Sequence, residues 1–206
     1  MIAIVDYGMG NLHSVRHALA TVGAGADAKI TSDPKDLERA ERIVFPGVGA
    51  FGECMKNIRA SGLLPTLERE VLEKRKPMFG ICVGMQVLAS VGEELGTHEG
   101  LGWIPGRVRR LKGDGVRVPH VGWNDARVIA TEHPVFRDLP RDSTFYYVHS
   151  FVFEPESRAH VAAVCDYGEE FVCALAKDNI IATQFHPEKS QDAGLTLLER
   201  FLRWNP

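Results

Sequence analysis

The stretch Pro77-Met-Phe-Gly-Ile-Cys-Val-Gly-Met-Gln86 decides the fold, because a short apolar run passes through two glycines into residues with helical spacing. Gly80 and Gly84 flank Cys82 in a G-x-C-x-G pattern, and glycines permit the sharp turn by which a strand enters a helix. Such a nucleophile elbow holds its central side chain at the carboxyl end of the strand, beside a helix N-terminus that favours a thiolate. Cys82 is therefore the candidate nucleophile; the alternative is a small cysteine buried in a tight turn.

Apolar segments on both sides of the elbow predict the rest of the fold. Strands are predicted at residues 2–5, 27–31, 42–45 and 77–82, and helices after Asn11 and Asp33, which can cap them, and over 53–60, 63–76 and 83–91. After Gly96 the pattern changes to short strands, at residues 106–111, 117–121, 125–130, 145–152, 161–166, 171–177 and 180–184, before a helix over 193–204. This order predicts an α/β fold, a flavodoxin-like three-layer sandwich whose mainly parallel central sheet has antiparallel additions in the C-terminal half.

Length, composition and charge set the class of protein. The chain has 206 residues, 45% of them apolar and 25% charged, and with no linker or repeat to divide it we expect one domain over residues 1–206. Its 24 basic and 27 acidic residues leave a net charge of −3, which disfavours nucleic acid as a partner. Without a signal-peptide pattern or an apolar run near the ~18 residues of a membrane span, no secretion or membrane contact is expected. Four cysteines without metal-ligand spacing favour a reduced, cytoplasmic protein and no metal site. No cofactor is expected.

A second motif supplies the base that a cysteine nucleophile needs. The apolar segment 180–185 runs into His186-Pro-Glu188. Pro187 favours an extended conformation at His186, and extended residues two apart project to the same side, so Glu188 can accept a hydrogen bond from one imidazole nitrogen. The other nitrogen of His186 is then free to meet Cys82. Taken alone, the tripeptide fits equally well a turn that ends a strand.

A third motif can stabilise the charge that develops on an attacked carbonyl. Pro46-Gly-Val-Gly49 follows the strand predicted at 42–45, which neighbours the elbow strand in a doubly wound sheet. Glycines there permit a peptide N–H to face the cysteine, as an oxyanion hole requires. An ordinary glycine turn between strand and helix fits the same residues, and the stretch alone does not decide between the two.

The remaining histidines and cysteines receive no catalytic role. His13 and His17 lie one helical turn apart but lack a third metal ligand, which favours two exposed polar residues. His133 precedes a proline without an acidic residue two positions later, which favours a turn. Cys54, Cys165 and Cys173 lack glycine elbows and are interpreted as packing residues.

Two groups of charged residues are interpreted as solvated surface. In the helix predicted over 63–76, Glu70 can pair with Lys74 one turn later. The basic side chains between residues 107 and 117 are expected on a solvated hairpin, with a contact to a partner left open; they are Arg107, Arg109, Arg110, Lys112 and Arg117.

Together the three motifs resemble those of the class I, or triad, glutamine amidotransferases. Residues 80–86 are similar to the nucleophile elbow of that family, 46–49 to its oxyanion strand, and 184–188 to its His-Pro-Glu ending. The resemblance implies a Cys-His-Glu triad of Cys82, His186 and Glu188 that hydrolyses the side-chain amide of L-glutamine. It further implies an oxyanion hole at Val48 and Val83, and glutamine-binding roles for Gly49, Gln86 and Ser150.

Four more stretches resemble the glutaminase subunits of imidazole glycerol phosphate synthases: residues 6–11, 119–124, 146–151 and 189–190. This resemblance implies a heterodimer with a cyclase subunit of barrel fold. Ammonia would pass to that subunit, which forms imidazole glycerol phosphate and aminoimidazole carboxamide ribotide in histidine biosynthesis. The residues that match interface positions are Asn11, Trp123, Asn124 and Lys189.

Two alternatives stay open. A sister glutaminase serving anthranilate, pyridoxal phosphate or GMP synthesis would carry the same triad, although Met85 and the stretches 122–124 and 148–150 favour the histidine pathway. A flavodoxin-like binding or scaffold protein would do no covalent chemistry; the pair Gly8-x-Gly10 could cradle a phosphate, but the third glycine of G-x-G-x-x-G is missing. Labelling of Cys82 by a glutamine-like electrophile would distinguish a glutaminase from a binding or scaffold protein.

Overall fold

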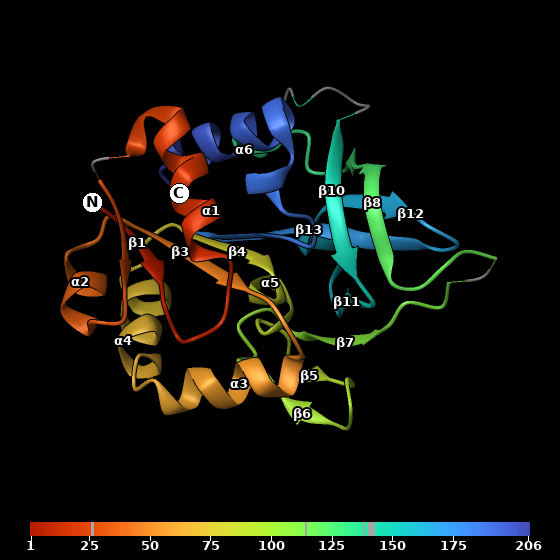
Figure 1. The fold of residues 1–206 in the computed structure, drawn as a ribbon, viewed down its shortest axis with the longest axis horizontal. Helices are drawn as coiled ribbons and strands as arrows, with labels where there is room; N and C mark the ends of the chain where they lie inside the picture. Colours follow the sequence, from red (N-terminus) through yellow and green to blue (C-terminus); the bar gives the residue numbers. More distant parts are fainter. Residues whose placement is uncertain (26, 114, 138, 140–142) are drawn as a thin grey trace.

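A computed structural model describes residues 1–25, 27–113, 115–137, 139 and 143–206 of the chain. The first half alternates strands and helices: β1 (Ile2–Val5), α1 (Leu12–Leu19), η1 (Ala20–Ala24), β2 (Ala28–Thr31), α2 (Pro34–Arg39), β3 (Arg42–Gly47), α3 (Phe51–Ala60), α4 (Leu64–Glu68), η2 (Arg69–Glu73), β4 (Met78–Cys82) and α5 (Val83–Gln86). Helices α1 and α6 (Gln191–Arg203) cover one side of the sheet, and α3 and α4 cover the other (Figure 1).

The second half adds mostly short strands: β5 (Val91–Gly92), β6 (His98–Glu99), β7 (Gly106–Arg110), β8 (His120–Asp125), β9 (Arg127–Val128), β10 (Thr144–His149), β11 (Phe151–Pro155), η3 (Arg158–His160), β12 (Val161–Asp166), β13 (Glu170–Lys177), β14 (Ile180–Thr183) and η4 (Pro187–Lys189). The main sheet has the order β2-β1-β3-β4-β14-β13-β11-β7-β5-β6. Strands β2 to β14 of this order are parallel, whereas β13, β11 and β7 pair antiparallel, as the sequence predicts.

Burial explains why the parallel strands sit at the centre. Every residue of β1, β4 and β14 is buried, as expected of strands that helices cover on both faces. Phe79 of β4 packs edge-on against Phe201 of α6, with ring centroids 5.3 Å apart, and so joins the sheet to the last helix. No helix in the described part of the chain has both the length and the apolar character needed to cross a membrane.

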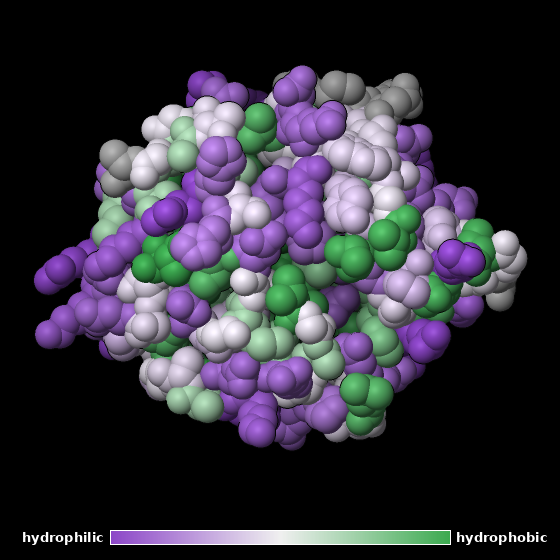
Figure 2. Space-filling model, in the orientation of Figure 1, coloured by the Kyte–Doolittle hydropathy of each residue, from purple (hydrophilic) through white to green (hydrophobic). Residues whose placement is uncertain are grey.

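A separate two-stranded sheet stands beside the main one. Strand β10 pairs antiparallel with β8 and not with the main sheet, so the strand predicted over 145–152 divides at Ser150 into β10 and β11. Val121 and Trp123 of β8 and Val148 of β10 are exposed there. Hydrophobic side chains gather near the middle of the face in Figure 2 and beside these two strands. Two other predicted strands of this region differ in their bounds. The strand predicted at 117–121 is β8, which begins at His120, and the strand predicted at 125–130 shortens to β9.

The helix predicted over 83–91 is wrong in length, because α5 ends at Gln86. The segment 100–104 returns alongside and donates backbone hydrogen bonds to the carbonyls of residues 87–90, which would otherwise continue the helix. Gly100 allows that close approach, since a Cβ there would lie 2.0 Å from the carbonyl oxygen of Ala89. At the start of α2, Asp33 caps the helix as predicted, whereas the side chain of Asn11 makes no capping hydrogen bond to α1.

The interpretation of Glu70 as part of a solvated face is wrong. Its side chain is buried, with Arg69, Lys74 and Lys76 at 3.2, 2.8 and 2.7 Å. Burial alone would raise the pKa of Glu70, but hydrogen bonds from these cations lower it to about 2. The expected pair with Lys74 forms inside this cluster and not on an open surface.

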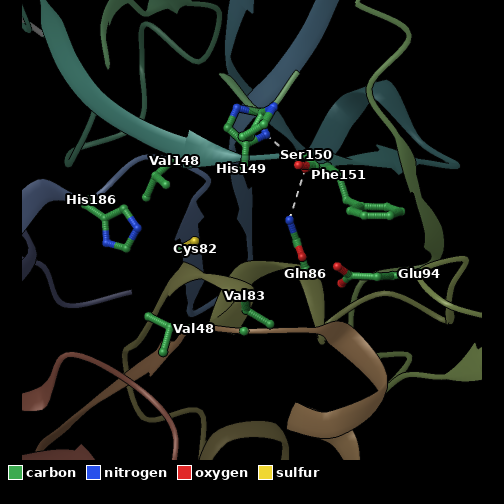
Figure 3. Close-up of a pocket in the computed structure, with 12 residues that line it drawn as sticks. Val48, Cys82, Val83, Gln86, Glu94, Val148, His149, Ser150, Phe151 and His186 are labelled. Carbon is green, nitrogen blue, oxygen red and sulfur yellow. Dashed lines mark hydrogen bonds between the residues drawn. The ribbon is translucent and has the colours of Figure 1, made fainter. Parts of the chain in front are cut away.

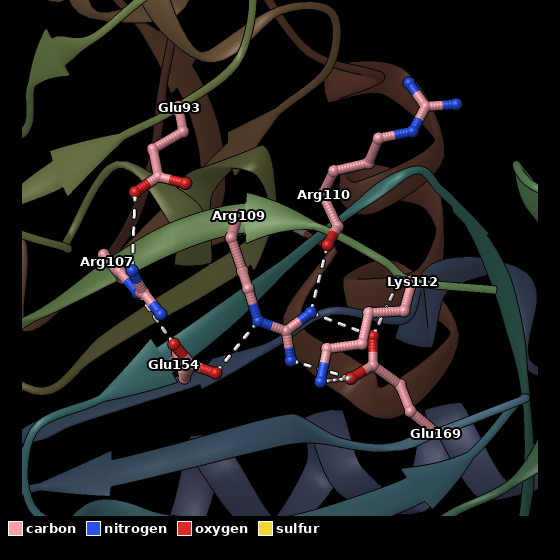
Figure 4. Close-up of polar contacts among 7 residues, drawn as sticks. All are labelled: Glu93, Arg107, Arg109, Arg110, Lys112, Glu154 and Glu169. Atoms are coloured by element: carbon pink, nitrogen blue, oxygen red, sulfur yellow. Dashed lines mark hydrogen bonds and ion pairs between the residues drawn. The ribbon is translucent and has the colours of Figure 1, made fainter. Parts of the chain in front are cut away.

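The basic stretch is likewise not a solvated hairpin, because β7 pairs with β11 inside the main sheet. The Arg109 guanidinium, 16% exposed, donates to both carboxylate oxygens of Glu169 at 2.8 and 2.9 Å and to Glu154 at 2.9 Å (Figure 4). Arg107 shares Glu154 at 2.7 Å. Residue 114, which belongs to this stretch, lies outside the described residues. Only Arg109 among the five basic side chains is largely buried, and the other four are exposed as expected: Arg107, Arg110, Lys112 and Arg117.

Candidate active site

Cys82 lies at a sharp turn between β4 and α5. Its φ of 55° is in the left-handed region, which costs a non-glycine residue energy and is common where a side chain must be presented for chemistry. The turn requires Gly84, because a Cβ there would lie 1.9 Å from the carbonyl oxygen of Phe45 in the neighbouring strand. Gly80 is needed for the same reason, since its Cβ would lie 2.9 Å from the carbonyl oxygen of Gly84. The strand, turn and helix therefore form the elbow geometry.

A cavity of about 280 Å³ opens over the cysteine, at the small end of ligand-binding cavities. The side chains of Cys82, His186 and Gln86 enter it from three different elements (Figure 3). The structure brings all predicted catalytic, oxyanion and glutamine-binding residues except Glu188 to this cavity, and the predicted interface residues lie outside it. Its lining comprises Val48, Gly49, Cys82, Val83, Gln86, Glu94, Pro119, Val148, His149, Ser150, Phe151 and His186.

The imidazole of His186 is held by Glu188, with Nδ1 2.7 Å from the Glu188 carboxylate. His186 is extended, as the following proline predicts, but residues Pro187–Lys189 form a turn of 3₁₀ helix. The expectation that both side chains leave one side of an extended strand is therefore wrong, and the turn produces the contact instead. Nε2 of His186 has no hydrogen-bond partner among the described residues. Burial lowers the pKa of His186, but contact with Cys82 and with Glu188 outweighs burial and raises it.

The candidate oxyanion strand lies against the elbow, because Gly47 of β3 pairs with Cys82 of β4 in register. Two side chains donate hydrogen bonds to its backbone carbonyls. The Tyr7 hydroxyl donates to the carbonyl of Pro46 at 2.9 Å, and the Cys54 thiol donates to the carbonyl of Val48, with Sγ 3.2 Å from the oxygen. These hydrogen bonds hold the Pro46–Gly47 and Val48–Gly49 peptides, which lie on either side of the Gly47–Val48 peptide.

A network of side-chain amides extends from the cysteine, and the sequence patterns did not reveal most of it. Gln86 Nε2 donates to Oε1 of Gln184 at 2.9 Å and to the carbonyl of Phe151 at 3.1 Å. Gln184 Nε2 in turn lies 3.8 Å from Sγ of Cys82. Gln184 directly follows β14 and stands two residues before His186, and this position is the signal that could have revealed it.

Glu94 is a second residue that no sequence pattern indicated. Its carboxylate lines the cavity and accepts the backbone N–H of Phe51, at the N-terminus of α3, at 2.8 Å. A carboxylate in a small cavity suits a cationic group of a ligand, such as an α-ammonium. Glu94 stands in the loop between β5 and β6 without a recognisable motif, so no sequence pattern distinguishes it from the other acidic residues.

Two of the four predicted interface residues, Trp123 and Lys189, lie on one surface around β10 and η4, whereas the side chain of Asn124 points to the opposite face of β8, toward His120. The Trp123 ring is half exposed and lies 6.0 Å from the Tyr146 ring, and the Lys189 ammonium lies 5.7 Å above the same ring. Asn124 donates to the backbone carbonyl of Asp166 at 3.0 Å. The fourth, Asn11, precedes α1, a helix that contacts η4.

The residues without an assigned role lie outside the cavity. His13 and His17 are exposed on α1, and His133 lies in a turn where its ring contacts Phe136 and Trp204. No group of three or more His, Cys, Asp or Glu side chains in the described ranges could hold a metal ion. Burial raises the pKa of three thiols, which are those of Cys54, Cys165 and Cys173.

Comparison with known proteins decides the family. Residues 3–204 match the model of the family "Glutamine amidotransferase class-I". The chain belongs to the class I glutamine amidotransferases. Among curated relatives, this amidotransferase is 46% identical to imidazole glycerol phosphate synthase subunit HisH of Neisseria meningitidis serogroup B over 213 residues, 98% of this chain and 99% of the relative. It is 47% identical to the HisH subunit of Acinetobacter baylyi, over 99% of this chain and 98% of that one.

Solved structures confirm the predicted fold class of the amidotransferase. PurLQS from Thermotoga maritima aligns with a TM-score of 0.74 at 18% identity, covering 98% of this chain and 97% of that one. A crystal structure of a glutamine amidotransferase aligns with a TM-score of 0.73 at 22% identity, covering 98% and 99%. At these identities the likeness concerns the fold alone. Membership of the family favours a glutaminase over a scaffold protein, and the HisH relatives favour the histidine pathway over its sister pathways.

Proposed function

We propose that this amidotransferase is the glutaminase subunit of an imidazole glycerol phosphate synthase. It hydrolyses L-glutamine to glutamate and ammonia and passes the ammonia to a cyclase subunit of barrel fold within a heterodimer. The full-length similarity to HisH subunits supports the pathway. The cavity that holds Cys82 opposite the His186–Glu188 pair carries the chemistry. Residues 1–206 are proposed to act as one amidotransferase domain.

In the proposed reaction, Sγ of Cys82 attacks the side-chain amide carbon of glutamine. The negative charge that develops on the amide oxygen is stabilised by the N–H groups of Val83 and Val48. His186 accepts the thiol proton and delivers it to the departing nitrogen, so ammonia leaves and a thioester remains. A water molecule, deprotonated by His186, then attacks the thioester, releases glutamate and restores the thiol. Glu188 holds the imidazole and stabilises its protonated form.

Glutamine is proposed to lie along the cavity with its side-chain amide at Cys82. Gln86, Gly49 and Ser150 line the path and offer hydrogen bonds to the substrate. The carboxylate of Glu94 is the proposed partner of the α-ammonium, because an opposite charge in a small cavity gives a strong, charge-assisted hydrogen bond.

The cyclase is proposed to dock on the surface formed by β8, β10 and η4. Exposed apolar side chains of Val121, Trp123 and Val148 suit a protein interface, and Lys189 beside Tyr146 supplies a polar contact. The same strand β10 contributes Val148 and His149 to the cavity, so a partner bound there lies directly against the glutamine site.

The experiment that tests this function replaces the nucleophile in the complete complex. Cys82→Ala should abolish glutamine-dependent synthesis, whereas external ammonia should still support the cyclase reaction. Cys82→Ser should show the same separation, because a serine hydroxyl is far less acidic than a thiol. Glutamine hydrolysis that persists in Cys82→Ala would refute the assignment of the nucleophile. A chain that forms no complex with a barrel cyclase would refute the pathway.

A further inference from the structure

Two buried histidines lie next to the candidate active site without a role in the proposed reaction. His149 of β10 lines the cavity, and His120 of β8 lies behind it. His149 Nε2 lies 3.0 Å from His120 Nδ1. Their side chains are packed among aromatic rings, and the His120 ring stacks on Tyr147 at 4.7 Å and on Tyr167 at 3.8 Å. Such a buried polar pair needs defined hydrogen bonds.

The carbonyl of Phe151 fixes the direction of these hydrogen bonds. It lies 3.0 Å from Nδ1 of His149 and 3.1 Å from Nε2 of Gln86. A carbonyl oxygen only accepts, so both nitrogens must donate, and His149 carries a proton on Nδ1. When His149 is neutral, its Nε2 has a free lone pair and accepts the Nδ1 proton of His120. Nε2 of His120 then accepts from the amide of Asn124, at 3.4 Å.

Both imidazoles are neutral at physiological pH. Burial lowers the pKa of His120 to about 4 and that of His149 to about 3. The proton of each neutral ring is therefore on Nδ1, and the order Asn124 to His120 to His149 to Phe151 has a single direction. We refer to His120 and His149 as the imidazole relay.

The same carbonyl also sets the orientation of two amides. Gln86 Nε2 faces two acceptors, the Phe151 carbonyl and Oε1 of Gln184, so a flipped Gln86 would place oxygen against oxygen. With its Oε1 engaged, Gln184 must direct Nε2 toward Sγ of Cys82, at 3.8 Å. A flipped Gln184 would instead direct an oxygen at the sulfur and repel a thiolate.

We propose that His120 and His149 are positioning residues that hold the Phe151 carbonyl, and through it the Gln86 and Gln184 amides, so that a hydrogen-bond donor always faces Cys82. The proposal rests on the proposed function in that it takes Cys82 as the nucleophile. It adds a role for His120 and His149, which touch no reacting atom, and for Gln184, whose Nε2 lies 3.8 Å from the sulfur. His120 and Asn124 lie on the face of β8 opposite to Val121 and Trp123, so the relay lies directly beneath the surface on which the cyclase is proposed to dock.

The test combines a spectroscopic and a chemical measurement on the full chain. Long-range ¹H–¹⁵N correlation spectra should show His120 and His149 as neutral rings protonated at Nδ1 at pH 7. The rate at which iodoacetamide alkylates Cys82, followed by peptide mass spectrometry, should fall about tenfold in His149→Leu, which lacks the donor to Phe151. His149→Asn should keep most of the rate, because the asparagine amide occupies the place of Nδ1. Gln184→Leu should slow alkylation as much as His149→Leu.

A matched control comes from His133→Leu, which removes another partly buried histidine outside the cavity and should leave the rate unchanged. Thermal unfolding verifies that each variant is folded, and if His149→Leu does not fold, the ring spectra and His149→Asn still decide. Rings protonated at Nε2, or equal alkylation in wild type and folded His149→Leu, would overturn the relay while leaving the nucleophile intact. If no glutamine-like electrophile labels Cys82, the proposed function is refuted. Histidine rings protonated at Nδ1 would still support the relay in that case.

Discussion

The thiol of Cys54 in α3 donates a hydrogen bond to Val48 of the cavity wall, with Sγ 3.2 Å from the Val48 carbonyl oxygen. Burial raises the pKa of Cys54 to about 11, so the group remains a thiol at neutral pH and can donate. This hydrogen bond holds the peptide between Val48 and Gly49. The preceding peptide, between Gly47 and Val48, is the one left to turn its N–H toward the cysteine.

Cys54→Ala should therefore lower the glutaminase turnover of the complex severalfold, because an oxyanion strand without this anchor spends less time with its N–H in position. Cys54→Ser keeps a hydroxyl donor and should retain most of the turnover. The measurement is kcat for glutamine hydrolysis in the presence of the cyclase. Cys165→Ala, which removes a buried thiol elsewhere, serves as the control. Equal kcat values for Cys54→Ala and wild type would show that the anchor has no influence.

The isolated chain should be a poor glutaminase that its partner activates. If the Gly47–Val48 peptide rests with its carbonyl toward Cys82, the oxyanion loses a donor, and one such donor is worth about 10²–10³ in turnover. Docking of the cyclase on the adjoining face would shift the peptide toward the N–H orientation. Glutaminase turnover should rise from the chain alone to the complex, and again when the nucleotide ligand of the cyclase is added. Equal rates in all three conditions would refute this gating and leave the triad untouched.

Glu188→Gln should lower kcat by about 10²-fold or more and change the KM for glutamine much less. The amide has the size of the carboxylate but cannot stabilise a protonated His186, which Glu188 contacts at 2.7 Å. Steady-state kinetics of the complex with glutamine separate the two parameters. A large rise in KM with unchanged kcat would instead assign Glu188 to substrate binding.

Glu94→Gln should show the opposite pattern, with a KM for glutamine raised about tenfold or more and a nearly unchanged kcat. In this variant the side-chain amide oxygen at position 94 can still accept the backbone N–H of Phe51. The N-terminus of α3 therefore keeps its hydrogen bond, and only the negative charge is removed. Exposed Glu99, outside the cavity, provides a control as Glu99→Gln. An unchanged KM in Glu94→Gln would place the α-ammonium elsewhere.

The free energy of unfolding should fall as the pH is lowered from 7 to 5. The folded-state pKa values of His120 and His149, about 4 and about 3, lie below the unfolded value near 6.5. Between these limits the unfolded chain binds more protons, so each histidine removes up to about 2 kcal/mol from the free energy of unfolding by pH 5. The carboxylate of Glu70 acts only at lower pH, because its pKa is lowered from 4.5 to about 2.

Urea unfolding at pH 7 and at pH 5 measures this loss. His120→Asn should lose less stability over the interval than wild type, since one of the two titrating groups is gone. An identical pH dependence in wild type and variant would contradict the buried, neutral state of His120.

Local patterns in the sequence were sufficient for the parts of the site that are close along the chain. The glycines around Cys82 predict the elbow because the constraint is a backbone turn, and His186-Pro-Glu188 predicts the base and its carboxylate because the contact spans two residues. The first four parallel strands follow from short apolar runs. The amidotransferase family and the fold class could therefore both be predicted from the sequence.

Contacts that depend on which strands are neighbours could not be predicted in this way. Gln184 meets Gln86 because β14 pairs with β4, and His149 meets His120 because β10 pairs with β8. The end of α5 was missed for a similar reason, since backbone groups from residues 100–104 terminate it. Glu94 has no pattern around it, and only the closed cavity reveals its place.

The carbonyl of Phe45 behind Gly84 also limits how the protein could be redesigned. In a library randomised over residues 80–86, folded clones should carry glycine at position 84, because even a methyl group would lie 1.9 Å from that oxygen. Met85 points into the core, whereas Val83 lines the cavity. Laboratory evolution toward other amides must therefore change positions 83 and 86 of the elbow or residues of the opposite wall of the cavity.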